Sequence, residues 1–204
     1  MGRVSNAKET LTKAVLELIW QGSYGATTID QICEKADVRK GSFYYFFDSK
    51  SDLAAAALET SWQARRPELD AIFSPTVPPL ERLRQFCDLG YKKQVALKCQ
   101  CGCVLGCPIF TLGSEICNQE EKLHIKIKEI LEHYHTYIES AIRDAHAAGL
   151  VHAPDPASKA RMLFAYSEGL MTQARIVNDA EVLREMADGM IEILGVKTSQ
   201  ARAA

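Results

Sequence analysis

The amino-acid sequence predicts an all-α protein. Apolar residues recur at helical spacing along most of the chain, as Ala14, Leu18 and Ile19 do near its start. Glycine, proline and capping residues divide these stripes into separate segments, which is typical of helices joined by short connections. The sequence lacks the strict alternation of apolar and polar residues that indicates half-buried strands. We therefore expect helices throughout and no sheet.

Size and composition are those of an ordinary globular protein. The 204 residues are 47% hydrophobic and 25% charged, which is enough to bury the core of one or two domains. No apolar run approaches the roughly 18 residues that a membrane-spanning helix needs. The first residues, Met1–Asn6, carry no apolar signal segment. We therefore expect a cytoplasmic protein with no membrane partner.

The charge distribution is weakly compatible with nucleic-acid binding. The net charge is −2, but residues 1–50 carry seven Lys/Arg against six Asp/Glu, whereas the remainder carries 17 against 20. A local basic surface can bind DNA even on a slightly acidic protein. Net charge alone does not identify the binding partner, so sequence motifs are needed to identify it.

Two short helices joined by a tight turn are expected near the start. A first helix ends in the glycine-bearing stretch 21–25. Thr28 and Gln31 form a capping-box pattern that begins the next helix, which runs to about Lys35. A turn at 36–38 leads to a second short helix over Arg39–Phe46. A longer helix followed by two short ones is the pattern of a helix-turn-helix unit that reads DNA.

The second short helix has an unusual composition. It is strongly aromatic and has Gly41 in its first turn, whereas a helix built for stability would use Ala, Leu and Glu. Gly41 lets the backbone approach phosphate or base edges, and Lys40 supplies charge. Tyr44 lies one turn from Lys40 and can contact a thymine methyl group or a phosphate. Phe43 and Phe47 are expected to face inward.

Capping residues and prolines delimit the later helices. A cap at Ser49 and Asp52 should begin a long Ala-rich helix that Pro67 ends or kinks. The expected segments after it are a loop at 74–79, a helix from Pro79, an interruption at Cys99–Cys107, a long helix at about 119–148, a helix over Pro156–Val177 and a last helix ending near Gly195.

The segment from Thr27 to Lys50 resembles the TetR family. The resemblance rests on Thr27-Thr28-Ile29, Ile32, Ala36, Val38, Lys40-Gly41-Ser42-Phe43-Tyr44-Tyr45-Phe46-Phe47 and Ser49-Lys50. It implies an obligate dimer on double-stranded operator DNA, a helical second domain with a ligand pocket, and release of DNA when ligand binds. The DNA contacts that it implies, with Arg39 added as a phosphate contact, are Thr28, Arg39, Lys40, Gly41, Ser42, Tyr44, Tyr45 and Lys50.

The sequence departs from the family pattern at two positions. Arg39 replaces the usual small capping residue, and Phe46 replaces the usual Tyr. The alternative is an unrelated helical bundle with core aromatics, in which Gly41 and its basic neighbours would have no purpose. The expected organisation is a DNA-binding domain over 1–50, a helical regulatory and dimerisation domain over 51–197, and a disordered tail over 198–204.

Seven cysteines, four of them between Cys99 and Cys107, allow three interpretations. Free cysteines often act as small buried hydrophobes, which we expect of Cys33, Cys87 and Cys117. A thiophilic metal such as Zn(II) or Cu(I) is a second interpretation, although the spacing is not that of paired Cys-x-x-Cys ligands. A reactive sensor thiol is the third. We expect no metal or other cofactor.

Two sensor cysteines are candidates. A helix that starts at Pro108 would put Cys107 at its N-cap, where the helix dipole lowers the pKa of a thiol. Gly102-Cys103 and the later stretch Leu112–Cys117 resemble the TetR subgroup that represses N-ethylmaleimide reductase. In that subgroup a Gly-Cys pair here carries the thiol that responds to electrophiles or oxidants. The resemblance makes Cys103 the first choice and Cys107 the second.

The helices over 79–177 are expected to surround a ligand pocket. Aromatic and flexible side chains are available to line it, although each is individually more typical of core: Phe86, Tyr91, Phe110, Tyr134, Tyr137, Phe164, Tyr166 and Met171. The resemblance assigns the last two helices, which carry Ala165, Gly169, Met186, Gly189 and Met190, to a dimer interface.

Three functions therefore compete. The first is a repressor that responds to thiol modification. The second is a repressor that binds a non-covalent hydrophobic ligand, with structural cysteines. The third is an enzyme with a cysteine nucleophile assisted by His133 or His135, against which stands the lack of hydrolase, zinc-protease and phosphate-loop motifs. We expect a regulator and no enzyme.

Overall fold

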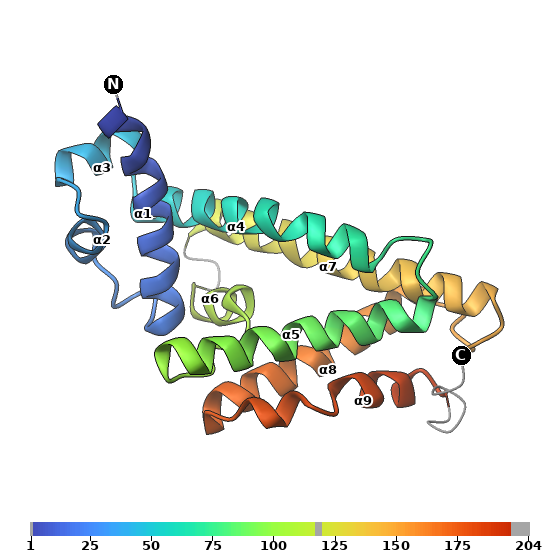
Figure 1. Cartoon of the computed structure of the whole chain (residues 1–204). Helices are drawn as coiled ribbons and strands as arrows, with labels where there is room; N and C mark the ends of the chain where they lie inside the picture. Colours follow the sequence, from blue (N-terminus) through green and yellow to red (C-terminus); the bar gives the residue numbers. More distant parts are fainter. Residues whose placement is uncertain (1, 117–119, 197–204) are drawn as a thin grey trace. The chain divides into compact units, whose positions relative to one another are not determined.

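The computed structural model describes residues 2–116 and 120–196, and every regular element in these ranges is helical. The all-α prediction is confirmed (Figure 1). The elements are α1 (Gly2–Gln21), α2 (Ile29–Ala36), α3 (Lys40–Phe46), α4 (Lys50–Ile72), α5 (Pro79–Cys101), α6 (Pro108–Ile116), α7 (Glu121–Ala147), α8 (Pro156–Val177), the 3-10 helix η1 (Ala180–Leu183) and α9 (Met186–Ile193). None of these helices is long and apolar enough to cross a membrane.

The chain forms two compact units. Unit 1 comprises residues 1–65 and 108–131, and unit 2 comprises 66–107 and 132–204. This partition differs from a division at residue 50, because α6 and the first part of α7 join the N-terminal helices in unit 1. The expected tail at 198–204 lies outside the described residues, as does Cys117.

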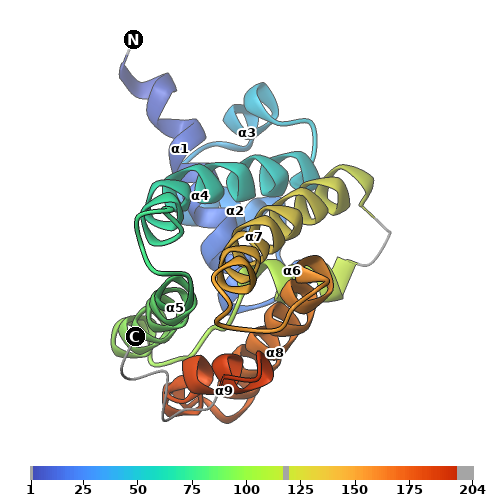
Figure 2. The same ribbon diagram turned by 90° about the vertical axis from the view of Figure 1, so that its right-hand side faces the viewer.

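Unit 1 holds α1, α2 and α3 around a shared apolar core. Helix α1 contacts α2, α3 and α6, and α2 contacts α3 (Figure 2). Leu11 and Val15 of α1, Ile32 of α2, Phe43 of α3 and Leu53 of α4 are fully buried. Burying large aliphatic and aromatic side chains is the main force that fixes such short helices, which are marginal by themselves.

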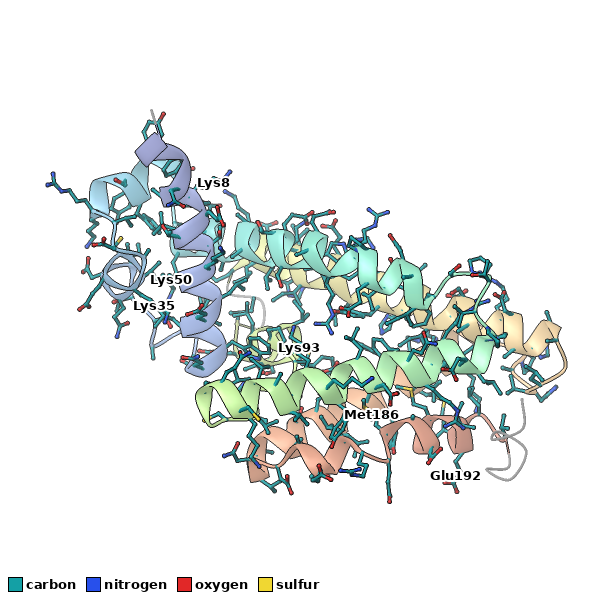
Figure 3. All side chains as sticks on the ribbon, in the orientation of Figure 1. Lys8, Lys35, Lys50, Lys93, Met186 and Glu192 are labelled. Carbon is teal, nitrogen blue, oxygen red and sulfur yellow. The ribbon has the colours of Figure 1, made fainter. Side chains whose placement is uncertain are left out.

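Unit 2 packs α5, α8, η1 and α9 together. Small residues permit the close approach: a Cβ atom on Gly90 of α5 would lie 2.8 Å from the Cε of Met171 and 3.5 Å from that of Met186. A Cβ on Gly189 of α9 would collide with the ring of Tyr166. Met186, labelled in Figure 3, is therefore core within one chain, and so is Met190.

Two helices continue past expected breaks, and of the two expectations for Pro67, a helix end or a kink, the end is wrong. Pro67 lies inside α4, which continues to Ile72 because Leu69 beyond it is fully buried and holds the last turns in place. Cys99 and Cys101 belong to the last turn of α5, so the interruption begins only at Gly102, whose φ of 77° is left-handed and ends the helix. The predicted starts at Pro79, Pro108 and Pro156 are confirmed.

Candidate nucleic-acid interface

A capping box fixes the start of α2. The Thr28 hydroxyl accepts a hydrogen bond from the Gln31 backbone N–H at 3.2 Å, and the Gln31 side-chain oxygen accepts one from the Thr28 N–H at 2.8 Å. The predicted cap is therefore confirmed. The Thr28 side chain is exposed while it serves as a cap. Two backbone donors at the helix start are thus satisfied by these two side chains.

The turn between α2 and α3 depends on a left-handed residue. Asp37 has φ 53° and ψ 47°, and the Val38 N–H then bonds to the Cys33 carbonyl oxygen at 3.0 Å. Aspartate tolerates this conformation better than most residues other than glycine. Helix α3 starts at Lys40, and Arg39 occupies the N-cap without a side-chain capping bond. The replacement of a capping residue by Arg39 therefore leaves this helix start uncapped.

Helix α3 has one buried face and one exposed face. Phe43 is fully buried and Phe47 is 6% exposed, as predicted, whereas Tyr44 and Tyr45 are 54% and 75% exposed. A Cβ on Gly41 would meet nothing within 4 Å, so the backbone there is open to a ligand. An exposed pair of large aromatic rings indicates a binding surface.

The Lys40 ammonium is already engaged within the reading unit. Its Nζ lies 2.7 Å from the Oδ1 of Asp30, on α2. The carboxylate raises the pKa of Lys40, first through the hydrogen bond and then through its charge. Both side chains are largely exposed, so the pair is weak and a phosphate can compete with Asp30 for the ammonium.

Lys50, which was expected to contact DNA, is engaged within unit 1. Its Nζ points into unit 1 and donates hydrogen bonds to the carbonyl oxygens of Tyr24 at 2.6 Å and Thr27 at 2.8 Å. It also lies 4.1 Å from the centre of the Tyr24 ring. Lys50 is labelled in Figure 3. The structure therefore uses this ammonium to hold the connection between α1 and α2.

The structure brings most of the predicted contacts onto α3 and its flanks. Next to Lys40 and Gly41, the Ser42 side chain is half-buried. The Arg39 side chain, at the N-cap position, is exposed. Two residues that the sequence pattern does not indicate also belong to this region: Asp30, which pairs with Lys40, and Glu115, which bonds to the α1–α2 connection.

Family models match both parts of the chain. Residues 11–57 match the model of bacterial regulatory proteins of the tetR family, and residues 79–190 match that of the tetracyclin repressor-like C-terminal domain. The chain belongs to the TetR family. The match over residues 11–57 covers α2 and α3, so these two helices form the family's helix-turn-helix, and the protein is a DNA-binding transcriptional regulator.

Curated relatives of this TetR-family chain are named as transcriptional regulators. The transcriptional regulator AcuR of Cereibacter sphaeroides is 28% identical over 84% of this chain and 78% of its own length. The transcriptional repressor NemR of Escherichia coli K12 is 25% identical over 87% and 88%. A regulatory TetR protein of Rhodobacter sphaeroides has a solved structure that superposes with a TM-score of 0.79 at 26% identity, covering 90% and 96% of the two chains.

Three of the four cysteines between Cys99 and Cys107 of the TetR-family chain are exposed. Cys99, Cys101 and Cys103 are exposed and Cys107 is half-buried. Cys103 follows the C-terminus of α5. Pro108 begins α6 as expected, so Cys107 directly precedes a helix N-terminus.

The side chains of the buried Gln94 and the exposed Asn178 fix the backbone of this segment in unit 2. Gln94, 2% exposed, accepts hydrogen bonds from the N–H groups of Leu105 at 3.0 Å and Gly106 at 2.9 Å and donates to the Gly106 carbonyl at 3.0 Å. Asn178 accepts from the Val104 N–H at 2.8 Å. The exposed Cys103 thiol therefore lies directly before a backbone segment, residues 104–106, that hydrogen bonds hold in place.

The structure also bears on the two other interpretations of the cysteines, a role as buried apolar side chains and a metal site. Cys33 and Cys87 are buried as expected, and burial raises the pKa of both thiols. Among the described residues, His, Cys, Asp and Glu side chains do not gather in groups of three that could hold a metal ion. A zinc or copper site thus has no ligand set in the part of the chain that is described.

The predicted pocket residues do not all lie together. Phe86, Tyr134 and Phe164 gather in unit 2, where ring centres of consecutive pairs lie 6.2 and 5.5 Å apart, and Phe73 joins them at 5.8 Å from Phe86. Tyr137 extends this cluster, with its ring 5.1 Å from Phe73.

The remaining candidates lie elsewhere. Tyr91 donates a hydrogen bond to Glu181 at 2.7 Å in a surface network. Phe110 is 39% exposed and belongs to unit 1. Tyr166 and Met171 pack against Gly189 and Gly90 respectively. These four side chains therefore do not share the aromatic cluster of unit 2.

Proposed function

We propose that this TetR-family regulator is a homodimeric repressor of a pseudo-palindromic operator, released when a thiol of residues 99–107 is modified. Residues 1–50 read the DNA, and residues 51–197 dimerise and respond. The observation that carries the first part is the exposed face of α3, where Lys40, Tyr44 and Tyr45 lie together beside an open backbone at Gly41. Such a face fits a major groove, offering charge to phosphate and rings to thymine methyl groups.

An exposed apolar stripe on α8 supports the homodimer. Met162, Ile176 and Val177 are 52%, 75% and 60% exposed. Between them lie Ala165 and Gly169 at helical spacing, and a Cβ on Gly169 would meet nothing within 4 Å. A second copy packed on this stripe would bury the apolar groups, and the small residues permit close approach of the helices.

Exposure and order together support Cys103 as the responsive thiol. An alkene electrophile such as N-ethylmaleimide forms a bond between the thiolate sulfur and one alkene carbon, and the neighbouring carbon takes up a proton, so nothing leaves. The thiol must be accessible, which Cys103 is, whereas Cys33 and Cys87 are buried. Because the backbone at 104–106 is fixed by Gln94 and Asn178, an adduct can disturb that ordered arrangement.

The DNA-binding part is tested by selecting duplexes from a random library and by sedimentation of the selected complex. The expected result is an inverted repeat bound by two copies of the chain, because one short recognition helix reads only a few base pairs. Tight binding of one copy to a single half-site would contradict the homodimer. Failure to enrich any duplex would contradict operator binding.

The thiol response is tested on the selected duplex before and after N-ethylmaleimide. Full modification of the wild type should lower affinity about a hundredfold, the shift that a differential of about 3 kcal/mol between two arrangements produces. Cys103→Ser should resist, and Cys99→Ser, at a cysteine that is also exposed, is the matched control. Unchanged affinity at full modification would contradict the thiol response.

The aromatic cluster of Phe73, Phe86, Tyr134 and Phe164 favours a second candidate, a non-covalent hydrophobic effector. Aromatic side chains commonly line sites for apolar ligands. This function predicts that a library of apolar small molecules contains one that releases DNA equally from wild type and Cys103→Ser. Release that depends on the thiol would contradict it.

A further inference from the structure

Charged side chains hold the connection between α1 and α2 from two sides. The Glu115 carboxylate of α6 accepts hydrogen bonds from the backbone N–H of Tyr24 at 2.8 Å and of Gly25 at 2.7 Å. The Lys50 ammonium of α4 donates to the carbonyl oxygens of Tyr24 at 2.6 Å and Thr27 at 2.8 Å. We call this arrangement of Glu115, Lys50 and residues 24–27 the clamp. All its members belong to unit 1.

In the clamp, each backbone group is bonded to a side chain whose charge is opposite to its own partial charge. N–H groups meet a carboxylate and carbonyl groups meet an ammonium, and such charge-assisted bonds are stronger than neutral ones. The Tyr24 side chain is 6% exposed and lies under the Lys50 ammonium, which excludes water from that side. The four bonds therefore fix both the position and the direction of a connection that has no regular structure of its own.

The held connection leads directly into the reading unit. Thr27 is followed by Thr28, the N-cap of α2, and Asp37–Arg39 then separate α2 from α3. Helices of eight and seven residues are too short to be stable alone, so external contacts must set their placement. A shift of residues 24–27 would therefore move α2, and with it the exposed face of α3.

We propose that Glu115 and Lys50 are positioning residues for operator recognition, through which α6 and α4 set the placement of the recognition helix. The proposal rests on operator binding by α3. Helix α6 begins at Pro108, which is bonded to Cys107, so the cysteine segment is joined to Glu115 by a single helix of nine residues.

Substitutions of Glu115 separate positioning from simple charge effects. Glu115→Gln removes a negative charge, which by electrostatics alone would raise affinity for DNA. The clamp predicts the opposite sign, because the amide replaces one acceptor by a donor facing an N–H group. Glu115→Asp keeps the charge but is too short to reach both N–H groups. Each variant should bind the selected duplex about tenfold more weakly, since charge-assisted bonds are lost.

Glu121→Gln is the matched control for charge. Glu121 is exposed on α7, outside the helix-turn-helix, and its substitution removes a negative charge from the same unit without breaking a bond of the clamp. Affinity should stay the same or rise. Glu115 is itself exposed on α6, so its replacement leaves no cavity in the core. Amide hydrogen exchange of residues 24–27 supplies a readout independent of DNA, and it should accelerate in both Glu115 variants.

Lys50→Met tests the other side of the clamp. A positioning role lowers affinity without changing the dependence on salt, whereas loss of a phosphate contact would reduce the salt slope by about one charge. The proposal is overturned if both Glu115 variants bind like the wild type, or if Lys50→Met reduces the salt slope. If the wild type selects no duplex at all, operator binding itself fails, which is a separate result.

Discussion

The Lys40 ammonium lies 2.7 Å from the Asp30 carboxylate, so the principal cation of the recognition helix is paired before DNA arrives. When operator DNA binds, a phosphate then replaces the Asp30 carboxylate as the partner of this ammonium. Because the pair is exposed, its loss costs little, and the exchange chiefly tunes affinity. Asp30 also places a negative charge where phosphates would approach, which disfavours binding that depends on charge alone.

Asp30→Asn should therefore raise affinity for the selected duplex about threefold at low salt, which is the size expected from an exposed pair. Lys40→Ala should weaken binding and reduce the salt slope by about one charge. In the double variant the gain from Asp30→Asn should shrink, because there is no ammonium left to release. The measurement is affinity across a salt series.

Glu17→Gln is the control for that experiment, since Glu17 pairs with Lys35 at 2.9 Å within the same unit. An equal gain from this variant would show that Asp30 acts only through overall charge.

Tyr44→Ala should lower affinity about tenfold, the size of one lost base or phosphate contact. Stability should change by less than about 0.5 kcal/mol, because the side chain is 54% exposed and removing it opens no cavity. Ile125→Ala, on α7 in the same unit and 56% exposed, is the control that should leave binding unchanged. Binding by titration and unfolding by urea check both statements. Wild-type affinity in Tyr44→Ala would remove this face of α3 from the groove.

Arg82→Met should destabilise unit 2 by about 2–4 kcal/mol, because the guanidinium is buried and its partners lose their bonds. Arg82 is 3% exposed, pairs with Asp144 at 2.6 Å, and donates to the carbonyl oxygens of Val77 and Pro75. Arg84→Met is the control: its pair with Asp188 is more exposed and should matter by less than about 1 kcal/mol. Urea unfolding measures both variants, and equal losses would contradict the prediction.

The clamp should persist to unusually low pH. Burial raises the pKa of the Glu115 carboxyl, but the bonds from Gly25 and Tyr24 and the Lys50 charge outweigh it, so the pKa lies below its usual range. The stabilisation is then fully present above the ordinary Glu value of about 4.3 and is lost as pH falls through the lower folded-state pKa. The Gly25 amide shift in NMR should titrate below 4.3. An inflection at or above that value would contradict the assignment.

Local rules predict much of the reading unit. Thr28 and Gln31 are three residues apart, so the capping box is visible in the sequence, and the spacing of Phe43 and Phe47 identifies the buried face of α3. These features depend on neighbours along the chain. The same holds for Pro79, Pro108 and Pro156, which begin helices as their fixed φ favours.

Such local rules do not predict contacts between residues that are far apart in the sequence. Glu115 is 91 residues from Tyr24, and no spacing signals that its carboxylate meets that backbone. Lys50 fits a family pattern of DNA contacts, yet its ammonium donates hydrogen bonds to the carbonyl oxygens of Tyr24 and Thr27, more than 20 residues away. Pro67 favours an end or a kink of the helix, but α4 continues to Ile72 because burial of Leu69 outweighs the local preference for an end.

Each unit carries a thiol that solvent does not reach: Cys33 in unit 1 is 5% exposed and Cys87 in unit 2 is 2% exposed. The Cys87 sulfur lies 3.4 Å from that of Met190 on α9, so it reacts only when α5 and α9 separate. Under native conditions, the labelling rates of these two residues, resolved by mass spectrometry, measure how often each unit opens. Equal rates mean that the units unfold as one cooperative body, and unequal rates mean that the less stable one opens by itself.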